Sequence, residues 1–250
     1  FPAGAKLGTE ANNVNFTSAW QSSGLTSFPP LDLSTGSNFA NSFTSSDLTS
    51  FPADIKMGTA VTGDVQFTDT WRDTTLNSFP ALDLGNGKFF NGAWRDCHEL
   101  TSFPSEIKLG TNRTGVGFID TWRSSGLTSF STPLPTGADV RSAWRNNTSL
   151  TDFSANVFNN WNPTSIASGV FNNTWVGNPA LTAISVENIL TSIDASNQHG
   201  TDDGTSTGNP LQDSGIDIHY DGGTLSAATN TAVTSLKAKG WSIVVNNVTL

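Results

Sequence analysis

The side chains that most often do chemistry in proteins are few in this sequence and widely separated. The histidines are His98, His199 and His219, and the one cysteine is Cys97. Metal sites place such ligands in characteristic spacings, and these residues show none of them. No nucleophile elbow, paired-carboxylate phrase or phosphate-binding glycine loop occurs. The sequence therefore predicts no catalytic residue, metal site or cofactor, although carboxylates distant in the sequence can still converge in space.

Two acidic turns contain the oxygen ligands that calcium prefers. One is Asp202-Asp203-Gly204-Thr205, and the other combines Asp217 with Asp221-Gly222. Turns of Asp and Gly are common as plain solvated loops. We favour that second interpretation.

A row of arginines is the strongest candidate for ligand binding. Each follows a tryptophan directly: Arg72, Arg95, Arg123 and Arg145. If the segments that carry them lie one above another, the guanidinium groups form a strip for an acidic or hydroxyl-rich glycan. The alternative, which we favour, is a solubilising row paired with neighbouring acids. Those acids are Asp69, Asp73, Asp96 and Asp120.

An internal repeat must position these side chains. The phrase Leu-Thr-Ser-Phe-Pro recurs in exact or weakened form, and its copies begin at Leu25, Leu48, Leu76, Leu100, Leu127, Leu150 and Leu181. Short and long spacings alternate, so the complete unit is a pair of coils. Repetition at a fixed spacing of this size is typical of proteins built from stacked supersecondary units.

A second phrase, an apolar residue followed four positions later by an aromatic one, precedes each copy of the first. The four-residue spacing places both side chains on one face of a single helical turn. We expect these rings to be buried between coils. The predicted core comprises Phe16, Trp20, Phe39, Phe43, Phe67, Trp71, Phe90, Trp94, Phe118, Trp122, Trp144, Phe171 and Trp175.

The expected fold is mainly β with short helical turns: a leucine-rich-repeat-like solenoid of about seven coils over residues 1–184. Leu-Thr-Ser-Phe is typical of a short strand, and so are Leu-Asp-Leu and Ile-Lys-Met. A β-sandwich would suit the aromatic and turn spacing too, but it does not require identical phrases in identical phase. An α+β cap is expected over 185–250. Its elements are a helix at 186–193, a loop at 197–214, a strand at 215–220, a helix at 227–239 after the N-cap Ser226, and a strand at 241–250.

Alternation of the two coil types also predicts a ladder of opposite charges. Equivalent positions in successive coils carry Lys6, Asp32, Lys56, Asp83 and Lys108. Opposite charges on neighbouring strands attract, whereas five like charges would repel.

The combination of the two phrases resembles the bacterial surface-antigen, or BspA-like, class of leucine-rich-repeat proteins. The closest match is Ala93-Trp94-Arg95-Asp96-Cys97-His98-Glu99-Leu100. The chain also resembles mycoplasma-type surface proteins and uncharacterised virion proteins of marine tailed phages. The resemblance covers residues 1 to about 184, and the C-terminal segment resembles that of the phage proteins. It implies a scaffold for adhesion and display rather than one chemistry.

The composition of the chain limits the classes of partner that it can bind. A net charge of −9 argues against nucleic acid or an anionic membrane surface. No apolar run approaches the roughly 20 residues that span a bilayer, so membrane insertion is not expected.

The chain opens inside a repeat. We therefore expect Phe1, Leu7 and Phe16 to be exposed and to form an interface, either with a preceding segment or with another protein subunit.

These observations favour a non-enzymatic display module on a virion or on a cell surface, such as a phage capsid or tail appendage or a surface adhesin. Its partner would be a glycan or protein of a host surface. One alternative is a purely structural assembly or decoration subunit without a ligand. A more distant one is a polysaccharide-cleaving enzyme on a β-solenoid.

Overall fold

The computed structural model describes residues 5, 7–8, 13–161, 169–196 and 215–250. Two helices, α1 (Ala183–Ala195) and α2 (Ala227–Ala238), are the longest elements of these residues. The strands have two to four residues each: β1 (Val14–Asn15), β2 (Asp32–Leu33), β3 (Gly36–Asn38), β4 (Lys56–Met57), β5 (Val65–Gln66), β6 (Asp83–Leu84), β7 (Gly87–Phe89), β8 (Lys108–Leu109), β9 (Ser129–Phe130), β10 (Asp152–Phe153), β11 (Gly215–Ile218), β12 (Ser242–Val245) and β13 (Val248–Thr249).

The predicted fold class, a mainly β solenoid of leucine-rich-repeat type, is therefore wrong. The strands form several small sheets in which parallel pairs predominate, namely β1-β3-β5-β7, β2-β4, β6-β8 and β10-β9, together with the mixed sheet β11-β12-β13. With two helices, the layout is α/β-like. The physical reason is that residues with a left-handed backbone interrupt extended structure in every repeat, as described below.

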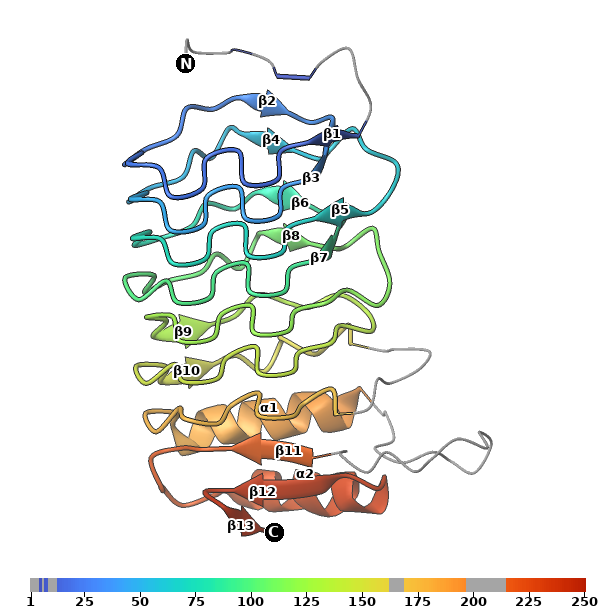
Figure 1. Cartoon of the computed structure of the whole chain (residues 1–250). Coiled ribbons are helices and arrows are strands. Elements are labelled where there is room, and N and C mark those ends of the chain that lie inside the picture. The colour runs from blue at the N-terminus through green and yellow to red at the C-terminus, as the bar shows by residue number, and fades with distance from the viewer. Residues whose placement is uncertain (1–4, 6, 9–12, 162–168, 197–214) are drawn as a thin grey trace.

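Successive repeats lie one above another and are joined by backbone hydrogen bonds (Figure 1). In the third repeat, the amide groups of Phe67 and Trp71 donate to the carbonyl groups of Phe89 and Ala93, at 2.8 and 2.9 Å. The amide groups of the alternating left-handed residues Asp69 and Asp73 donate to Asn91 O and Arg95 O of the same next repeat, both at 2.9 Å. The pattern of every second residue recurs from the first repeat to the sixth. We call this set of bonds the inter-repeat ladder.

The apolar-x-x-x-aromatic phrase does not form the predicted helical turn. It folds into consecutive tight turns, with hydrogen bonds from Thr70 N to Phe67 O and from Arg72 N to Asp69 O, both 3.3 Å. When the apolar residue is counted as position one, the residues at positions three and seven have positive φ, and position seven lies two residues beyond the aromatic one. These residues are Ser18, Ser22, Asn41, Ser45, Asp69, Asp73, Gly92, Asp96, Asp120, Ser124, Ser142, Asn146, Asn173 and Gly177. None is β-branched, because a branched side chain is strongly disfavoured in the left-handed region.

The aromatic residues form three columns that run through the repeats. Phe16, Phe39, Phe67, Phe90 and Phe118 stack at centroid distances of 5.2–5.4 Å. Beside them stand Trp20, Phe43, Trp71, Trp94, Trp122, Trp144 and Trp175, with ring planes within 10° of parallel. The third column, Phe28, Phe51, Phe79, Phe103, Phe130 and Phe153, meets the second edge to face. Of the thirteen predicted core residues, Trp20 alone is only partly buried.

The short strands Asp-Leu and Lys-Met or Lys-Leu occur where the sequence predicts them. Asp32 pairs with Lys56 across β2 and β4, and Asp83 pairs with Lys108 across β6 and β8. Lys108 Nζ lies 2.9 Å from Asp83 Oδ2. Lys6, the first member of the predicted charge ladder, lies outside the described residues.

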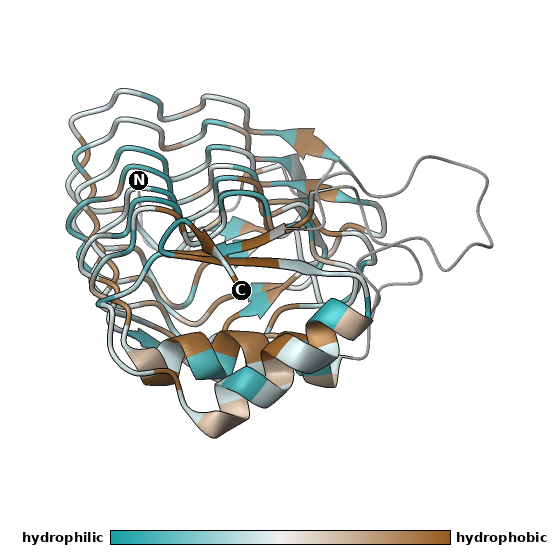
Figure 2. Cartoon of the chain, turned by 90° about the horizontal axis from the view of Figure 1, so that it is seen from below, coloured by the Kyte–Doolittle hydropathy of each residue, from teal (hydrophilic) through white to brown (hydrophobic). Residues whose placement is uncertain are grey.

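The C-terminal segment covers the last repeat with α1 and α2 lying side by side and β11 and β12 beside them (Figure 2). Thr182 and Ser226 cap the two helices, as their side chains accept from Ser185 N and Thr229 N. The strand predicted at 241–250 is instead the hairpin β12-β13, which turns at Asn246 and Asn247 with positive φ. No helix of the described residues is long and apolar enough to cross a membrane.

At the N-terminal end, the predicted exposure of Phe16 is wrong. The ring is buried and stacks on Phe39, while Leu7 and Val14 are partly buried against the same core. Phe1 lies outside the described residues. The Phe16 ring is held between Trp20 and Phe39, at centroid distances of 5.9 and 5.3 Å, which accounts for its burial.

Replacing a central indole should leave a large cavity. Trp94 is fully buried between Trp71 and Trp122. We expect Trp94→Ala to lower the free energy of unfolding by about 3–5 kcal/mol, as measured by denaturant titration. Trp20→Ala is the matched control, because Trp20 holds the same place in the first repeat but is partly exposed. An equal loss for both variants would contradict the stacking scheme.

The left-handed positions give a second prediction. Asn41 has φ 58° and donates its amide to Thr68 O. Asn41→Val should destabilise the chain by about 1–2 kcal/mol, because a Cβ-branched residue is strained there. Asn41→Gly should be nearly neutral, since glycine adopts this conformation freely. Thermal unfolding compares the two variants, and equal melting temperatures would show that the backbone at this position is not left-handed.

Candidate functional site

A cavity lies where the sequence departs from its own repeat. In the earlier short repeats, Leu31-Asp32-Leu33 and Leu82-Asp83-Leu84 supply strands that pair with the following long repeat. The third short repeat has Thr132-Pro133-Leu134-Pro135-Thr136 instead, and it forms no strand there. Proline lacks the N–H group that a ladder needs.

A pocket of about 680 Å³ results between β8 and this proline segment. Within the described residues, β8 pairs with β6 alone. On the other side of the pocket, Leu134 N donates to Val157 O at 2.8 Å, so the proline segment bonds to the repeat after it rather than to β8. One side-chain contact spans the gap: Thr132 Oγ1 donates to Pro104 O at 2.9 Å.

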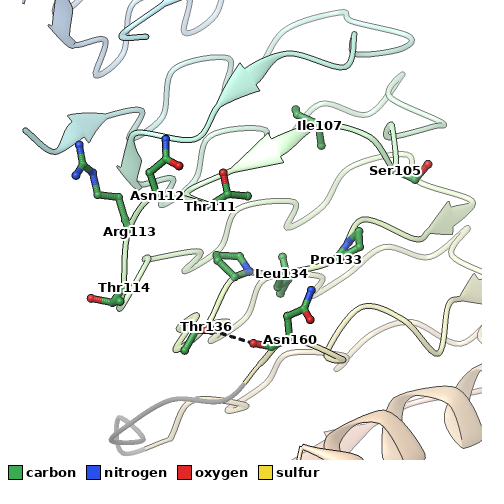
Figure 3. Close-up of a pocket in the computed structure, with 11 residues that line it drawn as sticks. Ser105, Ile107, Thr111, Asn112, Arg113, Thr114, Pro133, Leu134, Thr136 and Asn160 are labelled. Carbon is green, nitrogen blue, oxygen red and sulfur yellow. Dashed lines mark hydrogen bonds between the residues drawn. The ribbon is translucent and has the colours of Figure 1, made fainter. Parts of the chain in front are cut away.

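The pocket has an apolar floor and a polar rim (Figure 3). Ile107, Leu134 and Pro135 are buried. Most of the rim is exposed and carries hydroxyl and amide groups, from Ser105, Thr111, Asn112, Thr114, Thr136 and Asn160.

The charged residue of the lining, Arg113, is directed away from the pocket (Figure 3). Its guanidinium group donates to the carbonyl groups of Asn86, Thr62 and Gly63 and lies 3.4 Å from Asp64 Oδ1. The arginine therefore fastens the loop of the preceding long repeat, and the pocket itself offers a neutral surface.

The four arginines of the predicted strip do align across successive repeats. Asp73 N, Asp96 N and Ser124 N donate to the carbonyl groups of Arg95, Arg123 and Arg145, at 2.8–2.9 Å. Asp96 Oδ2 lies 3.5 Å from Arg72 Nε and 3.3 Å from Arg95 Nε. Asp120 Oδ1 lies 3.2 Å from Arg123 Nη1.

Acidic side chains thus form ion pairs with three of the four guanidinium groups, while Arg145 forms no ion pair within the described part of the chain. Among the described residues, no tryptophan is exposed beside the strip, because seven of the eight tryptophans are buried and the eighth, Trp20, is partly buried. The arrangement favours the solubilising interpretation of the row.

The residues considered first for chemistry are dispersed. Cys97 is buried, and burial raises the pKa of its thiol to about 11 although Thr74 hydrogen-bonds to the sulfur. His98 is exposed, and His219 Nδ1 accepts from Gly177 N at 3.1 Å.

His199 and the acidic turn Asp202–Thr205 lie outside the described residues. In the second acidic turn, Asp221 Oδ1 accepts from Gly223 N at 2.8 Å, which is the bond of a plain Asp turn. Among the described residues, no three His, Cys, Asp or Glu side chains gather as a metal site would require.

Sequence reasoning missed the pocket. The signal was present in the two prolines that replace the Asp-Leu strand in one repeat out of three. The pocket itself depends on packing between segments about 25 residues apart, and the spacing of the repeats alone does not predict that packing.

The acidic face next to the arginines gives a prediction for pH dependence. Burial raises the pKa of the Asp69 carboxyl above its ordinary value of 3.8, although Arg72 and Arg95 oppose the rise. The folded state therefore disfavours the ionised form, and this loss of stability develops as pH rises from the unfolded-state pKa to the folded-state pKa and is complete above it. We expect Asp69→Asn to stabilise the chain at pH 7 by up to about 1 kcal/mol after solvent screening, with the gain vanishing below pH 3.8.

Asp73→Asn is the matched control, since Asp73 has the same left-handed backbone but accepts a hydrogen bond from Ser45 Oγ at 2.8 Å. Denaturant titrations at both pH values should show no such gain for this variant. A gain for Asp69→Asn that persists at low pH would contradict the argument from burial.

Comparison of the chain with protein-family models, with curated proteins and with solved structures finds no match.

Proposed function

We propose that this chain is a non-enzymatic display module on a virion or cell surface and that it mediates attachment to a host surface. The observation that carries the proposal is the division between interior and exterior. The large rings fill the three columns, and the large hydrophobic side chains left exposed among the described residues are Ile184 and Val248. The repeats therefore present small polar groups outward on a framework fixed by the inter-repeat ladder.

Threonines of the Leu-Thr phrases illustrate this display. Thr49 Oγ1 donates to Thr26 O at 3.1 Å, Thr128 Oγ1 to Thr101 O at 3.2 Å, and Thr151 Oγ1 to Thr128 O at 3.1 Å. These bonds hold exposed hydroxyl groups in register along one ridge of the molecule. A fixed row of equivalent groups suits contact with an extended surface. The resemblance of the sequence to bacterial surface antigens supports the same proposal.

The chemistry of the side chains supports a non-enzymatic role. The Cys97 thiol is buried, and a thiol with a pKa of about 11 supplies little thiolate at neutral pH. On the arginine face, the carboxylates of Asp96 and Asp120 form ion pairs with arginines, and Asp73 Oδ2 accepts a hydrogen bond from Ser45 Oγ. The acidic net charge of −9 suits a module that stays soluble and does not bind nucleic acid.

An adhesion assay tests the proposal. Beads coated with the full chain should be retained saturably on at least one of three surfaces: Gram-negative bacteria, Gram-positive bacteria or animal cells. Beads coated with the heat-unfolded chain are the control. Retention should leave the surface polysaccharide intact, with no release of reducing ends.

Two results would contradict the proposal. Absence of retention on every surface, together with concentration-dependent self-association in sedimentation, would favour the alternative of a purely structural subunit. Release of reducing ends that is proportional to the amount of chain would favour the polysaccharide-cleaving enzyme.

A further inference from the structure

At the pocket beside β8, a strand of the repeat pattern is missing and the space is left open. Repeat proteins gain stability from each inter-repeat contact, so a gap in the middle of the array carries a cost. Departures from a local rule are expected at functional sites. The volume of about 680 Å³ lies within the range of roughly 300–1,000 Å³ that is usual for small-ligand pockets.

Several rim groups are free to bind a ligand. The side chains of Thr111, Thr114 and Asn160 form no hydrogen bond within the described part of the chain. The Thr136 hydroxyl donates to Asn160 O at 3.0 Å and keeps its lone pairs available as acceptors. Hydroxyl and amide side chains both donate and accept, which matches ligands whose own groups do the same.

The floor and the charges narrow the ligand class. Ile107, Leu134 and Pro135 present C–H groups rather than polar atoms at the base of the pocket. Arg113 is occupied by Asp64 and by carbonyl oxygens, so an anionic ligand would find no free cation among the lining residues. The lining offers no carboxylate for a cationic ligand.

We propose that this pocket binds a neutral, hydroxyl-rich ligand, one sugar residue of a glycan, with its C–H face on the floor and its hydroxyl groups at the rim. The inference rests on the attachment function proposed above and names the ligand class for it. A peptide strand fits less well. The free edge of β8 has two residues, and the opposite wall contains two prolines without N–H groups, so a paired strand would gain few hydrogen bonds.

An NMR titration of the isotope-labelled full chain tests the inference. The probes are the methyl glycosides of glucose, galactose, mannose and N-acetylglucosamine. Glucuronate, glucosamine and a blocked alanine tripeptide represent the anionic, cationic and peptide classes. We expect saturable shifts of the amides of Ile107, Thr111, Leu134 and Asn160 with at least one neutral glycoside, and weaker or no response to the other classes.

Ser105→Phe places a ring at the mouth of the pocket and should weaken this binding at least about tenfold. Ala53→Phe is the matched control, because Ala53 holds the equivalent exposed position of the preceding long repeat, in Phe51-Pro52-Ala53-Asp54-Ile55 against Phe103-Pro104-Ser105-Glu106-Ile107. Unchanged far-ultraviolet circular dichroism and melting temperature establish that both variants fold.

Three results would overturn the inference: no saturable shift with any neutral glycoside, equal binding by the Ser105→Phe and Ala53→Phe variants, or tighter binding of a charged or peptide probe. Bead adhesion that survives Ser105→Phe while glycosides fail to bind would leave the attachment function intact and reject the pocket. Glycoside binding without any bead adhesion would reject the attachment function instead.

Discussion

The rest of the structure depends on the inter-repeat ladder, in which the amide of every second residue in the turn segment donates to a carbonyl group of the next repeat. Two left-handed residues per repeat make this possible, because they fold the chain back every four residues while keeping its donors aimed along one direction. Ser, Asn, Asp and Gly hold all of these positions. The abundance of small polar residues, which would otherwise suggest loops, is thus a requirement of the backbone.

The ladder also sets the spacing of the aromatic columns. Rings of equivalent residues must lie one repeat apart, and centroid distances of 5.0–6.4 Å in the tryptophan column match offset stacking. The gain from burying the large indole ring outweighs the cost of burying its N–H group. The indole N–H groups of Trp71, Trp94, Trp122, Trp144 and Trp175 are buried and have no hydrogen-bond partner within the described residues. Leaving such a group unpaired costs about 1–3 kcal/mol, which burial of the ring must offset.

The sequence predicted the phase of the repeats, the buried aromatic residues and the short strands at Asp32, Lys56, Asp83 and Lys108, because identical phrases in identical positions require identical environments. It failed on local conformation. A four-residue spacing between rings fits one helical turn and two consecutive tight turns equally well, so the spacing alone does not distinguish the two. The distinguishing signal was the run of left-handed-tolerant residue types at the third and seventh positions. The pocket was missed because it arises from packing between segments distant in the sequence, although Pro133 and Pro135 marked the place.

The repeats display small polar groups outward, and one of them omits a strand to leave a pocket. Both features require that the inter-repeat ladder be the most stable part of the molecule. Native-state hydrogen exchange measures this directly. The ladder amides of the central repeats, such as those of Phe67, Trp71, Phe90 and Trp94, should exchange slowest, with similar opening free energies, and protection should decline toward the first repeat. Exchange of these amides as fast as that of the exposed loop at 62–64, while the amides of α1 remain protected, would contradict the account.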